Sequence, residues 1–195
     1  DFSALNFGGC RADGSTCLHD GVAPVSSHFF GQSSFASHAI AAAHNLVKVP
    51  AEAPLELLGP LGCGIMTGAG AVMKALKLQA GETILITGGG PVGLSAVIAA
   101  KASGAGQIIV ADPLATRRAM ALDLGATHVI DVTASDTAEQ LRKLLPQGVD
   151  CVLDTSGAVP AIDAGVASLA PLGRLAIVGV PKALDAAISL NILTL

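Results

Sequence analysis

The segment from Gly88 to Gly93 carries glycines at a spacing that suits phosphate binding. Gly88, Gly90 and Gly93 fit the pattern G-x-G-x-x-G. In this pattern the first glycine permits a tight turn, the second lets the backbone approach a pyrophosphate, and the third allows close packing. Pro91 suits the first turn of a helix, whose N-terminus would offer N–H groups and a positive dipole end to the phosphates. The spacing therefore predicts a dinucleotide-binding turn.

An acidic residue follows this turn at the distance that a dinucleotide site requires. Asp112 ends a predicted strand 19 residues beyond Gly93. There its carboxylate can accept both hydroxyls of an adenosine ribose and would repel a 2′-phosphate, which favours NAD over NADP. Arg117 and Arg118 follow within a turn and could flank the adenosine phosphate side, so NADP stays open. The pattern would also suit a tight turn with a solvated aspartate, or a methyltransferase that binds adenosylmethionine.

The elements around this turn alternate between strands and helices. The sequence predicts five strands with starts 24, 21, 22 and 24 residues apart, at residues 83–87, 107–112, 128–131, 150–154 and 174–180. Helices are predicted at residues 92–103, 116–124, 137–145 and 160–169. Because the strands are continuous apolar runs, both faces of their sheet should be covered, which predicts an α/β fold with a parallel, doubly wound sheet. A solenoid is disfavoured because the runs are not self-similar.

The first fifty residues differ in composition from the rest. They hold all five Phe and all but one of the five His, with frequent Gly and Ser. Local alternation predicts a strand at residues 34–41 in a small β domain. Pro60 and the glycines at residues 62–64 mark the boundary, which predicts domains at residues 1–62 and 63–195.

Composition excludes several classes of protein. A formal net charge of -4 with 11 Lys+Arg argues against a nucleic-acid partner. Every long apolar window is interrupted by Gly, Pro or a charge, which argues against a membrane-spanning helix. Four Cys, two of them in apolar runs, are typical of a reducing, cytoplasmic compartment. The start at Asp1 and the apolar stop at Leu195 predict a segment of a longer protein.

Three further segments carry a family resemblance. GCGIMTGAGAV, followed by a strand–helix unit with GGGPVG, resembles the zinc-dependent medium-chain alcohol dehydrogenases. DFSALNFGG, HFFGQSSFASHAI and LELLGPLGCGIMTGAGAV are similar to the aryl- or benzyl-alcohol branch, in the family's order and over essentially the whole chain. The resemblance implies part of a GroES-like catalytic domain, then a Rossmann domain. It also implies oxidation of a primary, aromatic alcohol to an aldehyde.

The resemblance also assigns roles to individual residues. By itself Cys63, beside glycines, suits a small buried residue; the resemblance implies that it is one of three protein ligands to a catalytic zinc. Thr67, the catalytic candidate, and Val92 match positions beside the nicotinamide. The turns expected to line the cofactor further along the sheet are at Thr155 and at Val178, Gly179 and Val180. The family pairs two subunits through a last strand, here residues 186–190, so a homodimer or homotetramer is expected.

Other parts of the family's machinery do not match residues of this sequence. The remaining zinc ligands, the proton relay and the four-Cys structural zinc lobe would lie upstream of residue 1. Cys10, Cys17 and His19 give C-x6-C-x-H, which is not the tight spacing of a structural zinc site. The other histidines are expected to be surface or hydrogen-bonded loop residues: His28, His38, His44 and His128.

Two further functions stay open. A zinc-free medium-chain reductase that uses NADPH, similar to a quinone reductase, is opposed by Asp112 and Cys63. A non-enzymatic NAD-binding module would share the glycine turn and the acid, but it would have no activity.

Overall fold

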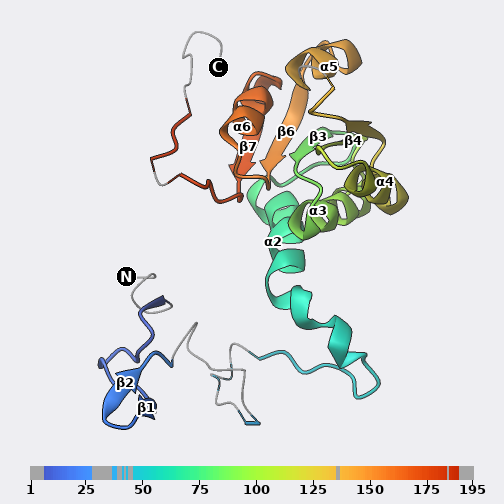
Figure 1. Cartoon of the computed structure of the whole chain (residues 1–195). Coiled ribbons are helices and arrows are strands. Elements are labelled where there is room, and N and C mark those ends of the chain that lie inside the picture. The colour runs from blue at the N-terminus through green and yellow to red at the C-terminus, as the bar shows by residue number, and fades with distance from the viewer. Residues whose placement is uncertain are drawn as a thin grey trace. The chain divides into compact units, whose positions relative to one another are not determined.

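The computed structural model describes residues 7–27, 37–38, 41, 43, 46–134, 137–183 and 185–188 (Figure 1). The chain divides into two compact units, Asp1–Pro54 and Leu55–Leu195, and each is described by itself. Residues 55–62, which the composition grouped with the first domain, therefore belong to the second unit. The identification of the first unit with part of a GroES-like domain stays a prediction.

The described part of the first unit contains a short antiparallel hairpin. Strand β1 (Leu18–Asp20) pairs with β2 (Ala23–Val25), with Leu18 opposite Val25. Beside the hairpin, the Ser27 hydroxyl accepts the backbone N–H of Cys17 at 3.2 Å. The strand predicted at residues 34–41 falls mostly outside the described residues, and His28 and His44 do so entirely.

The second unit is built on a parallel sheet in the order β5-β4-β3-β6-β7. Its strands are β3 (Thr83–Thr87), β4 (Gln107–Ala111), β5 (His128–Ile130), β6 (Val149–Asp154) and β7 (Leu169–Ile177). The sheet begins with its central strand β3, extends outward through β4 and β5, and then continues on the other side of β3 with β6. In such sheets ligands bind outside the carboxyl ends of the strands at the point where the strand order reverses, which here lies between β3 and β6.

Helices cover both faces of this sheet. Ile84 and Ile86 of β3 pack on one face with α2 (Gly64–Gly70), the π-helix η4 (Ala71–Ala75), α3 (Pro91–Ala102) and α4 (Ala115–Leu124). Leu85 points to the other face and packs with Leu141 of α5 (Thr137–Leu144). Helix α6 (Val159–Val166) lies on this second face, where its Gly165 approaches Val152 of β6. The predicted doubly wound α/β fold is confirmed (Figure 1).

Two short 3-10 helices, η2 (Leu55–Leu57) and η3 (Gly59–Gly62), precede α2. In the part of the chain that the structure describes, no helix combines the length and the apolar character needed to cross a bilayer.

The largest departures from the predicted elements lie at the C-terminal end. The helix predicted at residues 160–169 ends at Val166, and Leu169 instead begins β7, where it pairs with Val149. Strand β7 stops at Ile177 rather than at residue 180, and the N–H groups of the next two residues both donate to the carbonyl of Asp154. The last strand predicted at residues 186–190 does not form in its described residues, 186–188, and the rest lies outside the description.

Candidate functional site

The glycine turn joins the carboxyl end of β3 to the N-terminus of α3, in the middle of the sheet. Gly88 has a φ of +98°, a conformation that L side chains rarely adopt, and its N–H donates to the carbonyl of Ala111 at 2.8 Å. A Cβ atom on Gly93 would lie 1.9 Å from the carbonyl oxygen of Gly88. The first and third glycines therefore let the helix begin directly against the turn.

The second glycine of the pattern borders open space. Gly90 precedes the first residue of α3, Pro91, and has the extended angles φ −76° and ψ −177°. A Cβ atom placed on Gly90 would meet no heavy atom within 4 Å beyond its chain neighbours. Room for a ligand therefore exists at the N-terminus of a 12-residue helix, where N–H groups and the helix dipole favour an anion.

The Asp112 side chain is hydrogen-bonded to the glycine turn. Its side chain is only 2% exposed, and its Oδ2 accepts the N–H of Gly89 at 2.7 Å. Its Oδ1 accepts the N–H of Leu114, also at 2.7 Å. A carboxylate can accept about four hydrogen bonds, so two bonds leave capacity for ribose hydroxyls. The acid thus shapes the turn, a structural role that the sequence reasoning missed.

The two arginines beside Asp112 have different surroundings. The Arg118 guanidinium donates to the Asp112 carbonyl at 2.7 Å and to the Asp131 carboxylate at 2.6 Å. Arg117 is more exposed, with its Nη1 3.7 Å from Oδ2 of Asp112. Arg117 is therefore the more available of the two for a phosphate, a distinction between the two arginines that the sequence did not make, and its contact with a cofactor stays a prediction.

Thr155 contacts the glycine turn from the neighbouring strand. Its hydroxyl lies 2.9 Å from the carbonyl oxygen of Thr87 and 3.0 Å from that of Gly88, and donates toward both. Its backbone N–H donates to Thr87 as well, at 2.9 Å. Thr155 therefore links the carboxyl ends of β3 and β6 at the switch point. Its contact with a cofactor stays a prediction.

The last predicted cofactor segment follows β7. The N–H groups of Val178 and Gly179 donate to the carbonyl of Asp154 at 2.9 and 3.1 Å. Val180 comes next and is strongly exposed. These contacts bring residues 178–180 beside residues 155–157, at the carboxyl ends of β6 and β7.

Cys63 lies between η3 and α2 and is exposed, so the alternative of a small buried residue is wrong. Its carbonyl accepts the N–H of Thr67 at 2.8 Å, and Thr67 is half-buried one turn into α2. The carbonyl of the next residue, Gly64, accepts the Ser95 hydroxyl of α3 at 3.1 Å, and a Cβ atom on Gly64 would lie 3.9 Å from Cβ of Pro91. The fold thus brings the segment around Cys63 to the start of the same helix that the glycine turn opens.

The described residues do not form a complete metal site. No group of three or more His, Cys, Asp or Glu with metal-binding geometry occurs among them. Cys63 therefore fits zinc only as a single thiolate donor, which by itself does not hold the ion. His128 Nδ1 lies 3.0 Å from the Thr127 hydroxyl, and His38 lies 3.2 Å from the Ser37 hydroxyl, both local contacts.

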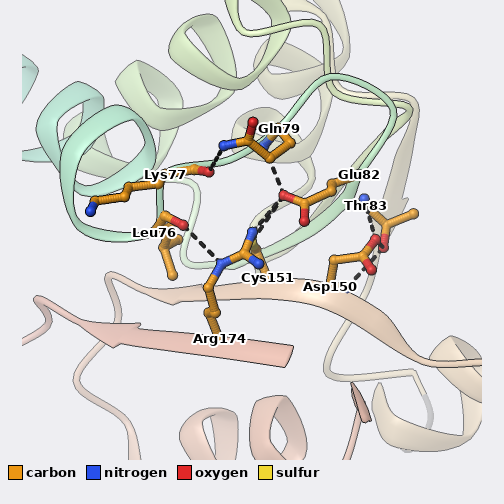
Figure 2. A network of polar contacts seen from close by, with 8 residues as sticks. All are labelled: Leu76, Lys77, Gln79, Glu82, Thr83, Asp150, Cys151 and Arg174. Atoms are coloured by element: carbon orange, nitrogen blue, oxygen red, sulfur yellow. Dashed lines mark hydrogen bonds and ion pairs between the residues drawn. The ribbon is translucent and has the colours of Figure 1, made fainter. Parts of the chain in front are cut away.

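A second polar network lies at the opposite, amino ends of the strands (Figure 2). Nε of Arg174 donates to the carbonyl of Leu76 at 2.8 Å, and its Nη2 pairs with Glu82 and lies 3.1 Å from Sγ of Cys151. Burial raises the pKa of the Cys151 thiol above its ordinary value, and the nearby Arg174 only partly opposes this. The network ties the end of η4 to the sheet, away from the glycine turn.

Asp150 belongs to the same end of the sheet (Figure 2). Its carboxylate accepts the N–H and the hydroxyl of Thr83, each at 2.8 Å. The N–H bond from Thr83, more than any other contact, lowers the pKa of this carboxyl below its ordinary value.

Comparisons with known proteins agree with this architecture. Residues 91–195 match the family model described as zinc-binding dehydrogenase. Geraniol dehydrogenase of Castellaniella defragrans is 47% identical over 193 residues, covering 98% of this chain and 52% of that protein. A solved alcohol dehydrogenase zinc-binding domain protein from Burkholderia ambifaria is 46% identical with a TM-score of 0.92, covering 99% of this chain and 52% of that one.

The solved benzyl alcohol dehydrogenase of Acinetobacter calcoaceticus is 40% identical with a TM-score of 0.89, at the same coverage of 99% and 52%. The chain therefore spans about half the length of these relatives. The family match covers more than half of the chain, and the resemblance to medium-chain alcohol dehydrogenases is confirmed. The chain belongs to the zinc-binding dehydrogenase family.

Proposed function

We propose that this chain is the cofactor-binding part of an NAD-dependent, zinc-containing alcohol dehydrogenase, which oxidises a primary, aromatic alcohol to an aldehyde. The observation that supports this proposal most directly is the glycine turn. Gly88 and Gly93 meet backbone to backbone, Gly90 borders open space, and the buried Asp112 is bonded to the turn. This arrangement combines room for a pyrophosphate with an acid for the adenosine ribose.

The residues assigned to NAD follow the carboxyl ends of the strands. In this proposal Gly90 and Pro91 hold the pyrophosphate at the start of α3, Val92 packs beside the nicotinamide, and Asp112 holds the ribose with Arg117 beside it. Thr155 and residues 178–180 line the nicotinamide end. NAD, when bound, supplies the hydride acceptor for the alcohol carbon. Thr67, half-buried on α2, orients the ring and the substrate in the proposal.

Cys63 is the proposed zinc ligand within this chain. Its thiol is exposed and its segment packs on the start of α3, so it lies on the same side of the fold as the cofactor turn. Because the described residues supply no complete ligand set, the other ligands in this proposal come from beyond them.

The names of the relatives support the proposed substrate class. Benzyl alcohol and geraniol, after which two relatives are named, are both primary alcohols whose carbinol carbon adjoins an unsaturated carbon. This shared chemistry favours an alcohol next to an aromatic ring or a double bond.

The test uses the full gene product that contains these residues. We expect NADH to bind with a fluorescence change, and NAD-dependent oxidation of benzyl alcohol to release the aldehyde. Cys63→Ala should abolish alcohol oxidation and lower the zinc content, while NADH binding is retained. The matched control is Cys17→Ala, an exposed cysteine in the first unit. Unchanged activity in Cys63→Ala would contradict the ligand assignment, and quinone reduction with NADPH alone would favour the zinc-free reductase.

We further propose that the protein is a homo-oligomer in the cytoplasm. Among the described residues, strand β7 is the last strand on its side of the sheet, and the exposed Ile177 lies at its end. An exposed apolar edge favours pairing with a second copy, as a homodimer or homotetramer. A monomer in gel filtration of the full gene product would contradict this. The four cysteines are unpaired, which supports a reducing, cytoplasmic location.

A further inference from the structure

We propose that Asp154 is a positioning residue for the nicotinamide end of the cofactor site. Its buried carboxylate would hold two turns in place, residues 155–157 and residues 178–180. The inference rests on the proposed function, because it needs a cofactor at the carboxyl ends of the strands. It adds a residue to which the sequence pattern gave no role.

The Asp154 side chain is 0% exposed and is surrounded by donors. Its Oδ1 accepts the Thr87 hydroxyl at 2.7 Å and the Ser156 hydroxyl at 2.6 Å. The N–H of Ser156 reaches the same oxygen at 3.2 Å, and Oδ2 accepts the N–H of Gly157 at 3.0 Å. Because every contact is made by a donor, the group acts as an acceptor, which suits a carboxylate. The first turn is therefore built around this side chain.

The second turn packs on the same residue. The carbonyl of Asp154 accepts the N–H groups of Val178 and Gly179 at 2.9 and 3.1 Å. A Cβ atom on Gly179 would lie 2.1 Å from the nitrogen of Gly157 and 2.5 Å from Oδ2 of Asp154. A Cβ atom on Gly157 would lie 2.3 Å from the carbonyl oxygen of Val180. The two turns thus touch through their backbones, so a shift of the carboxylate would displace both.

The adenosine end of the site is held by different groups. The Asp112 carboxylate bonds the N–H groups of Gly89 and Leu114, and it lies beyond β4 rather than β6. A change at Asp154 should therefore affect the two halves of a dinucleotide unequally. This difference separates a positioning role from a general loss of stability.

The chain contains a matched control for this residue. Asp150 lies four positions earlier on β6 and accepts the Thr83 hydroxyl of β3, at 2.8 Å. The same pair of strands is therefore joined by an Asp–Thr bond at each end, with Asp154–Thr87 at the cofactor end and Asp150–Thr83 at the other. Both bonds should support the sheet, whereas only the first adjoins the two turns.

The experiment compares Asp154→Asn with Asp150→Asn in the full gene product, by titration with NADH and with AMP. In Asp154→Asn one carboxylate oxygen becomes an NH2 donor, so an existing donor loses its acceptor. We expect Asp154→Asn to raise the Kd for NADH about tenfold. The substitution should loosen the two turns, and NADH must then order them again when it binds. In both variants the Kd for AMP should stay within about twofold of that of the unsubstituted protein. In Asp150→Asn the Kd for NADH should also stay within about twofold.

Equal NADH affinities in the two variants would overturn the inference, and so would a matching loss of AMP affinity in Asp154→Asn. Failure of the unsubstituted protein to bind NADH would instead overturn the proposed function, and the inference with it. If Asp154→Asn does not fold, Thr87→Val and Thr83→Val give the same comparison with the loss of one hydroxyl each, and the Thr83 hydroxyl also accepts the N–H of Asp150 at 3.0 Å. A selective loss of NADH affinity in Thr87→Val would then support the inference, and equal affinities would overturn it.

Discussion

Gly93 lies so close to Gly88 that a Cβ atom on Gly93 would come within 1.9 Å of the Gly88 carbonyl oxygen. A side chain at this position would therefore force the first turn of α3 away from the end of β3. The neighbouring Gly90 has no such constraint, because a Cβ atom there would meet open space. The glycines of one short pattern thus differ in what they do for the fold and for a ligand.

Gly93→Ala is expected to destabilise the protein by roughly 1–3 kcal/mol, because the backbone must move to accept the methyl group. Gly90→Ala should leave the free energy of unfolding nearly unchanged, since its methyl group would extend into open space. It should instead weaken NADH binding about tenfold, equal to about 1.4 kcal/mol, because its methyl group would occupy the room for a phosphate. Urea unfolding and NADH titration of both variants separate these effects. If both variants bind NADH as tightly as the unsubstituted protein, the proposed turn is contradicted.

Asp112→Asn is expected to reduce the preference for NAD over NADP. The amide removes the charge that would repel a 2′-phosphate, and its NH2 group can no longer accept one of the two backbone N–H bonds that Asp112 makes. The ratio of the two cofactors isolates the effect of the charge, because the altered turn affects both. We expect the ratio of kcat/KM for NADP to that for NAD to rise about tenfold, an effect of about 1.4 kcal/mol. Asp123→Asn, an exposed aspartate on α4, is the matched control. An unchanged ratio in Asp112→Asn would show that this acid does not select the cofactor.

Asp150 gives the protein a stability that depends on acid pH. The Thr83 N–H holds the pKa of the Asp150 carboxyl below its ordinary value of 3.8, so the folded state favours the charged form. This stabilisation is complete above the ordinary value and is lost as the pH falls through the lowered pKa. The unfolding midpoint in urea should therefore fall less steeply below pH 4 in Asp150→Asn than in the unsubstituted protein. Parallel pH profiles would contradict the assignment.

Cys151 is expected to resist alkylation in the folded protein. Its side chain is 0% exposed, and burial raises the pKa of the thiol above its ordinary value of 9.0. Iodoacetamide at pH 8 should label Cys17, which is exposed, and should label Cys151 only in denaturant. Mass spectrometry of the peptides measures this directly. Labelling of Cys151 at the rate of Cys17 under native conditions would be inconsistent with its burial.

The same raised pKa predicts a loss of stability in alkali. Above the ordinary value of 9.0 the unfolded chain releases the Cys151 proton while the folded protein keeps it. The free energy of unfolding therefore decreases as the pH rises from there toward the folded pKa. Cys151→Ser, which does not titrate in this range, should show a shallower decrease in urea unfolding at alkaline pH. An equal decrease in both proteins would assign the alkaline loss to another group.

The sequence by itself determined the features that depend on neighbouring residues. Continuous apolar runs predicted the five strands of the sheet, because a strand covered on both faces needs no polar alternation. The glycine spacing predicted the turn between β3 and α3, and the position of Asp112 followed from the end of β4. The segment around Cys63 indicated the family through its motif rather than through its geometry.

The tertiary structure decided the contacts that join distant segments. Thr87 and Asp154 are 67 residues apart, and Arg174 and Glu82 are 92 apart, so only the pairing of β3 with β6 and of β6 with β7 brings them together. Leu169 shows the same limit: its apolar spacing suited a helix, but its pairing with Val149 placed it in β7. The local pattern cannot specify such choices, because they depend on which strands become neighbours in the sheet.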